Sequence, residues 1–302
     1  MGLNVSTYIN TSLIYGGCSW WILKNTMVRD INQWEVKRLT KSLPKLNNPF
    51  LIEGLPGIGN VGKITVDFII EELDATPLYE FFSFSLPASV FVNDSNLVDL
   101  PKIRMYYKAF KNKRKRDVLI LAGDVQPVDD ISSYRFSEVI LKIAEKFGAR
   151  EIITLGGVGL SEIPDKPKVY CTGNMKSIVQ RYKVQTNLKT RLYGTIGPII
   201  GVSGILVGLS RRMKIPAVSL LAETYGHPMF LGVKGAREIV KVLNKKCALN
   251  INIRKMNGEI KRFEDHLAQN LAEELDEMPD PQAYEALLSG RKALSKDQNY
   301  IG

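Results

Sequence analysis

Short apolar runs alternate with amphipathic segments through the middle of the chain, and this alternation limits the possible folds more than any other feature. Strands that alternate with helices usually form a mainly parallel sheet with helices on both faces. The sequence therefore predicts an α/β fold, with one antiparallel hairpin around Lys111. The predicted strands lie at residues 48–53, 77–84, 89–92, 103–110, 117–121, 151–155 and 217–221. The predicted helices lie at residues 63–73, 132–147, 174–182, 199–213 and 234–246.

The two ends of the chain differ from this middle part. Residues 1–23 carry no charge, and ordinary globular composition starts near Met27, where residues 28–43 show helical spacing. Nine acidic and two basic residues lie between Glu259 and Glu285. The first six residues also match the N-myristoylation pattern, which is short and common. We expect a poorly ordered extension at residues 1–26, an α/β core domain at 27–258, and an acidic helical appendage with a flexible tail at 259–302.

Charge and composition exclude several classes of partner. The net charge of +10 suggests a nucleic-acid or membrane surface, but the positive charge is scattered except at residues 111–116. That run contains no aromatic residue, so it predicts a solvated hairpin tip and no nucleic-acid partner. The apolar run at residues 196–209 is broken by four glycines and a proline, and no run is long enough to cross a bilayer. Three widely spaced cysteines and two histidines show no metal or disulfide spacing. We therefore expect a cytoplasmic protein without a metal ion or a membrane partner.

The most specific local motif is a glycine-rich turn at residues 54–63, between a predicted strand and a predicted helix. It contains Gly57-x-Gly59-x-x-Gly62, the dinucleotide fingerprint, with Glu80 downstream as a candidate ribose-binding acid. The same residues form most of a phosphate-binding P-loop, but Ile64 stands where that motif needs a hydroxyl for Mg²⁺. Alternatively, the glycines allow a sharp turn and close packing of the helix on the sheet.

A second glycine cluster follows the predicted strand at residues 151–155, and both clusters should meet at the carboxyl edge of the sheet. Ligands usually bind at this edge in such folds, so a small-molecule pocket is one interpretation. A purely structural junction that needs no cofactor is the other, and we favour it. The residues concerned are Gly57, Gly59, Asn60 and Gly62 of the turn, with Gly157 and Gly159 of the second cluster.

No other pattern provides a catalytic site. The four glycines within residues 197–208 recur at helical spacing, which predicts a glycine face for close packing inside the fold, or for a ligand or subunit. Glu223 and His227 could form an acid–base pair at the end of a strand, but no serine or cysteine nucleophile lies in a strand–helix elbow near them. A hydrogen-bonded loop is the simpler interpretation. The sequence therefore predicts a binding protein without catalytic residues.

Taken in order, these glycine-rich pieces resemble the archaeal form of the proteasome assembly chaperone 2 family. The resemblance covers about residues 48–245 and implies a three-layer α/β/α sandwich, akin to nucleoside phosphorylases but without their active site. It also implies homo-oligomers and no enzymatic activity. Some archaeal members bind the outer ring of the 20S proteasome through a C-terminal tail of a hydrophobic residue, a tyrosine and any residue. The matching stretches are Glu53–Gly62, Gly156–Gly159, Gly197–Gly208 and Leu220–Thr224.

The end of the chain departs from that tail pattern. Tyr300 is third from the end instead of second, and polar Asn299 precedes it. The resemblance implies that Tyr300, Ile301 and Gly302 dock on the 20S proteasome α-ring. Two classes of function stay open: a homo-oligomeric protein that binds the proteasome, and a nucleotide- or small-molecule-binding protein, or an enzyme, that uses residues 54–62.

Overall fold

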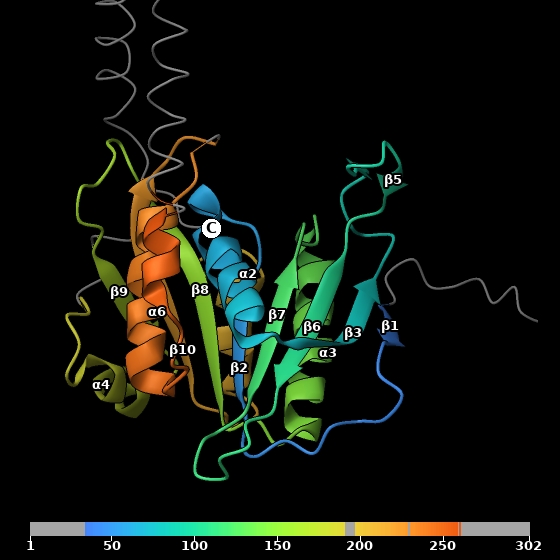
Figure 1. Cartoon of the computed structure of the whole chain (residues 1–302), viewed down its shortest axis with the longest axis horizontal. Helices are drawn as coiled ribbons and strands as arrows, with labels where there is room; N and C mark the ends of the chain where they lie inside the picture. Colours follow the sequence, from blue (N-terminus) through green and yellow to red (C-terminus); the bar gives the residue numbers. More distant parts are fainter. Residues whose placement is uncertain (1–33, 191–196, 229, 259, 261–302) are drawn as a thin grey trace, which may run out of the picture.

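An eight-stranded sheet forms the centre of the computed structural model, which describes residues 34–190, 197–228, 230–258 and 260 (Figure 1). The strand order is β1-β3-β6-β7-β2-β8-β10-β9, and β4 pairs with β5 in a separate two-stranded sheet. The strands are β1 (Glu35–Arg38), β2 (Phe50–Gly54), β3 (Thr76–Phe82), β4 (Phe91–Val92), β5 (Val98–Asp99), β6 (Ile103–Lys108), β7 (Val118–Gly123), β8 (Glu151–Leu160), β9 (Val169–Gly173) and β10 (Ala217–Tyr225).

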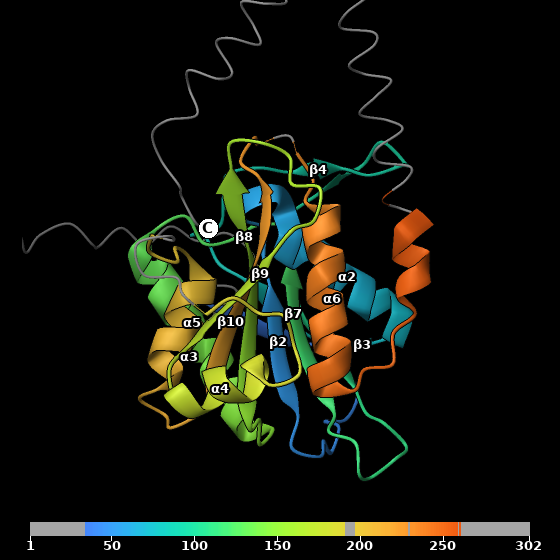
Figure 2. The same cartoon turned by 90° about the vertical axis from the view of Figure 1, so that its left-hand side faces the viewer.

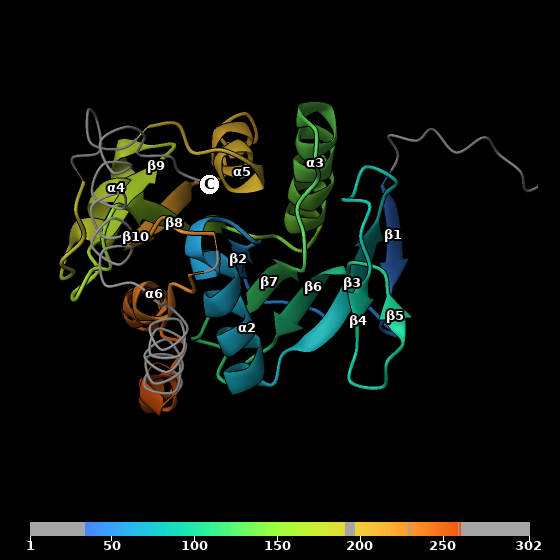
Figure 3. The ribbon, with the colours of Figure 1, turned by 90° about the horizontal axis from the view of Figure 1, so that it is seen from above.

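Helices cover both faces of the large sheet (Figure 3). Helices α2 and α6 pack together on one face, α3 and α5 pack together on the other, and α4 packs against β9 and β10. The predicted α/β fold with helices on both faces is therefore confirmed. The helices are η1, a short 3₁₀ helix (Ile58–Asn60), α2 (Val61–Leu73), α3 (Asp130–Lys146), α4 (Lys176–Lys183), α5 (Val202–Ser210) and α6 (Val233–Cys247).

Parallel pairing is concentrated in the middle of the sheet. Strands β7, β2, β8 and β10 are parallel neighbours, whereas β1, β3, β6 and β9 join through antiparallel pairs. The predicted hairpin around Lys111 is the β6–β7 pair, and the antiparallel part extends beyond it to β3 and β1. Short connections permit antiparallel pairing only, which explains why β6 and β7 pair in this way.

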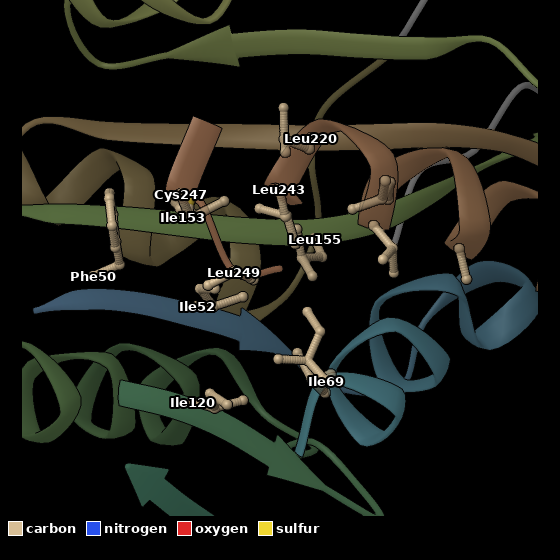
Figure 4. Packing of buried hydrophobic residues seen from close by; sticks show 14 of the residues in the cluster. Phe50, Ile52, Ile69, Ile120, Ile153, Leu155, Leu220, Leu243, Cys247 and Leu249 are labelled. Atoms are coloured by element: carbon tan, nitrogen blue, oxygen red, sulfur yellow. The ribbon is translucent and has the colours of Figure 1, made fainter. Parts of the chain in front are cut away.

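Two hydrophobic clusters fill the two sides of the sheet. Alternate residues of β2 point to opposite faces, so Phe50 and Ile52 pack with α2 and α6 while Leu51 packs with α3 and α5 (Figure 4). The central strands are buried on both faces, which is why their sequences are continuous apolar runs. This rigid centre positions every turn at the carboxyl edge of the parallel strands.

Several boundaries differ from those predicted. The helical spacing of residues 28–43 is misleading, because the described part of that range contains the short edge strand β1. Strand β8 runs through the second glycine cluster to Leu160, and β10 continues to Tyr225 alongside it. Strand β9 has no counterpart in the prediction, since it has five residues and alternating burial. Glycines usually interrupt strands, which is why the sequence pattern predicts that β8 ends at Leu155.

The predicted glycine face of the helix near residues 199–213 does not form. Helix α5 begins at Val202, so only Gly204 and Gly208 lie within it. Gly201 is the residue before the helix and has a left-handed φ of 84°. A Cβ at Gly204 would clash with the Ile199 carbonyl oxygen, whereas one at Gly208 would meet nothing within 4 Å. Gly201 and Gly204 therefore serve the start of α5, whereas Gly208 is not needed for close packing.

The basic run at residues 111–116 is only partly a solvated tip. Arg116 lies over the Phe50 ring, 3.6 Å from its centroid, and its guanidinium donates to the Asn48 carbonyl oxygen at 2.8 Å. It also pairs with the buried carboxylate of Glu151 at 3.0 Å. The prediction of a fully solvated tip is therefore wrong for Arg116, which fastens the β6–β7 hairpin to β2 and β8.

The end of the described chain is helical. Residues 253–258 form helix beyond α6, and within it Met256 is fully buried and Lys255 pairs with Glu72 of α2 at 2.5 Å. The predicted extension at residues 1–26 and appendage at 259–302 lie outside the described residues apart from Ile260, so these domain limits stay predictions. Within the described ranges, no helix has the length and apolarity needed to span a membrane, and no cluster of side chains could hold a metal ion.

Candidate functional site

The glycine-rich turn connects β2 to α2 and reverses the chain within a few residues. Gly59 has φ 60° and Asn60 has φ 49°, both in the left-handed region. Glycine adopts this region without strain and asparagine tolerates it better than most residues. The Asn60 amide donates to the Gly57 carbonyl oxygen at 2.9 Å, which closes the turn just before Val61 starts the helix.

Gly62 of the turn and two glycines of β8 let the turn and β8 approach each other closely. A Cβ at Gly62 would lie 2.6 Å from the Leu155 carbonyl oxygen of β8. A Cβ at Gly157 would lie less than 3.0 Å from the Ile58 carbonyl oxygen, and one at Gly159 would lie 3.4 Å from the Ile58 side chain. The six predicted site residues therefore do come together, because β8 continues past Leu155 and lies directly against the turn.

Strand β10 and the start of α6 cover the same turn from another side. The Gly232 amide donates to the Gly59 carbonyl oxygen at 2.7 Å. A Cβ at Gly59 would lie 2.6 Å from the Thr224 hydroxyl oxygen, and Gly59, Val61 and Gly62 are all buried. The protein's own strands thus fill the space around the first turn of α2. This packing favours the interpretation as a structural junction over a phosphate cradle.

The proposed ribose-binding acid lies elsewhere. Glu80 belongs to β3, which is separated from β2 by β6 and β7. Its carboxylate accepts two hydrogen bonds from Arg104, at 2.6 and 2.9 Å. The distance of Glu80 from Gly62 in the sequence suits a ribose-binding acid only if the strand that carries Glu80 pairs with β2. Strand β3 instead belongs to the antiparallel part of the sheet.

A buried carboxylate beside the turn was missed by the sequence analysis. Glu53 on β2 is fully buried, and its Oε1 accepts hydrogen bonds from the Leu55 amide at 3.1 Å and the Ser203 hydroxyl at 3.2 Å. Burial raises the pKa of Glu53 to about 7, against the smaller lowering effect of these two hydrogen bonds. Its Oε2 has no hydrogen-bond partner in the described part of the chain. In the sequence, the only sign of this buried carboxylate is a single acidic residue inside an apolar strand.

Gln126 fastens the turn to the other helical layer. Its amide nitrogen donates to the Pro56 carbonyl oxygen, and its amide oxygen accepts from the Val202 amide at 3.1 Å. Together with the contact between Ser203 and Glu53, this bridge holds the start of α5 against the end of β2. No sequence pattern pointed to Gln126, since it lies in a loop far along the chain from both partners.

Glu223 and His227, the suggested acid–base pair, each contact other residues. Glu223 lies within β10, where its carboxylate accepts from the Lys168 amide at 2.8 Å and from the Tyr170 hydroxyl at 2.9 Å. The His227 ring stacks on Tyr225, with 5.8 Å between ring centroids. Glu223 therefore holds the start of β9 in place through Lys168 and Tyr170. It lies in a strand, whereas the sequence predicts a hydrogen-bonded loop.

A groove of about 560 Å³ lies between α6 and residues 185–189, on the side of the molecule that faces the viewer in Figure 2. Lys168, Lys189, Lys241 and Lys245 line it, and Val169, Leu188 and Val242 are among its apolar residues. It shares no lining residue with the glycine turn. The predicted tail residues Tyr300, Ile301 and Gly302 lie outside the described residues.

The filled turn leads to a first prediction. We expect NAD, FAD, ATP and GTP to leave the melting temperature of the protein unchanged, because the Thr224 side chain of β10 already occupies the space beside Gly59 and the Ile58 carbonyl oxygen occupies the space beside Gly157. The measurement is a thermal-shift titration of each nucleotide, with and without Mg²⁺. Saturable stabilisation above about 2 kcal/mol, the effect of a roughly 100-fold excess of ligand over Kd, contradicts this prediction.

Comparison with known proteins identifies relatives over most of the chain. The PAC2 family model matches residues 51–271. Two uncharacterized proteins of Methanocaldococcus jannaschii are similar to the chain. MJ1210 is 26% identical over 232 residues, which cover 77% of this chain and 86% of that protein. MJ0106 is 27% identical over 243 residues, which cover 79% of this chain and 92% of that protein.

Solved structures show the same fold. PbaB of Pyrococcus furiosus, an archaeal proteasome activator, is 28% identical with a TM-score of 0.72, and the match covers 79% of this chain and 98% of PbaB. PbaA of the same organism, an archaeal homolog of proteasome-assembly chaperone, is 23% identical with a TM-score of 0.64. That match covers 86% of this chain and 98% of PbaA, and at this identity it shows the fold alone.

Proposed function

Because the chain belongs to the PAC2 family, we propose that it is a non-catalytic, homo-oligomeric protein that binds the 20S proteasome α-ring. The similarity to PbaB extends over 79% of the chain and supports a proteasome-related, chaperone-like role. The observation that carries the non-catalytic part is the closed glycine turn. Gly62 of the turn and Gly157 of β8 allow close contacts between backbone segments, and Gly59 packs against the Thr224 side chain, so the motif builds the scaffold instead of holding a substrate.

The C-terminal tail is the part of the chain that we propose contacts the ring. Tyr300 offers a flat apolar ring with a hydroxyl group, Ile301 adds an aliphatic side chain, and a free carboxylate at Gly302 is the third part of the proposed contact. A carboxylate can form a charge-assisted hydrogen bond with a lysine of a partner pocket, and a tyrosine fits a pocket that has one polar end. Three terminal residues are therefore sufficient for a specific but small contact.

A contact of this size requires several tails to act together. One short tail should bind with a Kd on the order of 0.1–1 mM, about 4–5.5 kcal/mol. Linked binding sites can gain roughly 10²–10⁴ in apparent affinity over a single site. The homo-oligomer is thus a requirement of the mechanism, because it presents several tails to one ring.

The test compares three versions of the full chain for binding to purified proteasome rings. We expect the native chain to bind, and both Tyr300→Ala and a chain with one residue added after Gly302 to bind at least about tenfold more weakly. The first change removes the aromatic ring and the second displaces the terminal carboxylate. Light scattering or electron microscopy of ring complexes provides the measurement. Equal binding by all three versions, or by none, contradicts tail docking and directs the search to the body of the domain.

A further inference from the structure

A small hairpin stands clear of the large sheet (Figure 1). It exposes an unusual number of apolar side chains. It consists of β4 and β5 with the turn between them, and we call residues 90–100 the apolar hairpin. Val92 and Val98 face each other across its two strands and are 68% and 67% exposed. The other exposed apolar residues of the hairpin are Val90, Phe91, Leu97 and Leu100.

The polar residues of the apolar hairpin are used to fix its shape. The Asn93 side-chain oxygen accepts from the Ser95 and Leu97 amides, at 3.0 and 3.1 Å, and its amide nitrogen donates to Asp99 at 3.1 Å. Lys102 pairs with the same Asp99 at 3.0 Å. A solvated hairpin normally turns its polar side chains outward and its apolar ones inward. Here the polar groups hold the turn while the apolar side chains face solvent.

The exposed apolar surface continues at the base of the hairpin. Phe84 is 67% exposed, and the neighbouring Ser85 carbonyl oxygen accepts from the Val128 amide at 3.2 Å, which brings the start of α3 close. Ile131 and Tyr134, three residues apart and therefore on one face of α3, are both exposed. Isolated exposed apolar residues are normal, but a short hairpin with six exposed apolar side chains is typical of an interaction site.

We propose that the apolar hairpin is the surface through which a second copy of this chain associates to form the homo-oligomer. The proposal rests on the proposed function, which requires several tails on one particle. From Phe81 to Pro101 the only charged residues are Asp94 and Asp99, and depletion of charge at the centre is typical of permanent interfaces between identical subunits.

The geometry of the hairpin also fits a copy of itself. A lone two-stranded hairpin is marginally stable in water and gains stability when further apolar surface covers it. The large sheet does not cover Val92 and Val98, and a second copy of the hairpin offers apolar surface that matches them. In a two-fold interface the same patch pairs with itself, and an apolar patch can do so without any complementary charge pattern.

The test replaces the cross-strand pair in the full chain by Val92→Glu and Val98→Glu together. Light scattering after size-exclusion chromatography should show an oligomer for the native chain and the monomer mass of 33.9 kDa for the variant. We expect the dissociation constant to rise at least about 100-fold, because association would bury unpaired carboxylates. The matched control is Ile163→Glu with Val184→Glu, which places the same charges on exposed apolar residues away from the hairpin and should leave the oligomer intact.

A neutral variant, Val92→Ser with Val98→Ser, separates loss of association from misfolding. It should weaken association less than the glutamate pair does, with an unchanged circular dichroism spectrum. An oligomer of native size in both hairpin variants, or a native chain that is monomeric at all concentrations, overturns the proposal. Ring binding is measured separately on the same samples. Ring binding by a monomeric native chain overturns the self-association surface and the requirement for several tails, but it leaves the proteasome as the partner. An oligomer that does not bind proteasome rings supports the surface and contradicts the proposed function.

Discussion

Replacing Gly157 with alanine should lower the free energy of unfolding by about 3 kcal/mol or more, the upper part of the range for overpacking a closed core. The added Cβ would lie less than 3.0 Å from the Ile58 carbonyl oxygen, which is backbone and cannot rotate away. To make room, η1 must move away from β8, and Gly59 and its contact with Thr224 must move with it. Urea denaturation followed by circular dichroism measures the effect.

Gly208→Ala is the matched control for this substitution. Gly208 lies inside α5, and a Cβ there would meet nothing within 4 Å, so alanine should stabilise the protein by roughly 0.5–1 kcal/mol through helix propensity. Gly159→Ala should fall between the two, because its nearest neighbour, the Gly226 Cα, is 3.2 Å from the added atom. If the three variants have equal stability, the turn is loosely packed and the closed junction described above is wrong.

Glu53→Gln should remove a large pH dependence of stability. The carboxyl of Glu53 has a pKa of about 7 in the folded protein and an ordinary value of 4.5 when exposed. Between these values the folded state keeps a proton that the unfolded state has released, so native stability falls as pH rises from about 4.5 to 7. The loss attributable to this group is on the order of 3 kcal/mol, and it is complete above the folded pKa. Glutamine does not titrate, so the variant should lack this loss.

The measurement is urea denaturation of the native chain and the variant at pH 5, 6, 7 and 8. The difference between their unfolding free energies should shift in favour of the variant as pH rises, and other titrating groups cancel in that difference. Glu138→Gln, on the exposed face of α3, should keep the native pH dependence. Parallel pH curves for the native chain and Glu53→Gln would show that Glu53 is ionised in the folded state, with a partner outside the described residues.

The sequence predicted the centre of the sheet more successfully than its edges. Strands such as β2 and β7 are buried on both faces, so their apolar runs are unmistakable. The edge strands β1 and β9 are short and half exposed, and neither produces a continuous run. In β8 the glycines looked like an interruption, yet they are needed because the Ile58 carbonyl oxygen approaches the strand. The local sequence pattern around β8 cannot show this contact, because Ile58 lies about a hundred residues earlier in the chain.

The candidate site shows the same limit. The clustering of Gly57, Gly59 and Gly62 indicated a special turn, and the second cluster correctly pointed to the same edge of the sheet. The turn contacts residues of β10, α5 and the loop that carries Gln126. These segments lie far apart in the sequence, so the sequence pattern does not show that they meet. Glu53 was visible as one acid in an apolar strand, but its hydrogen bond to Ser203 follows only from how α5 packs. Surface exposure of the apolar hairpin is likewise a property of the assembled fold.

The mixed topology of the sheet also implies an order of assembly. Strand β6 pairs with β7 after a short connection, with Tyr107 opposite Leu119, whereas β2 must pair Phe50 with Glu151. Closing a short loop costs less entropy and is faster than closing a long one. We therefore expect the β6–β7 hairpin to form early and to serve as the template on which β2 docks, with Arg116 at its tip already positioned to meet Phe50. Strands β8 and β10 join afterwards, so the glycine turn reaches its native packing among the last steps of folding.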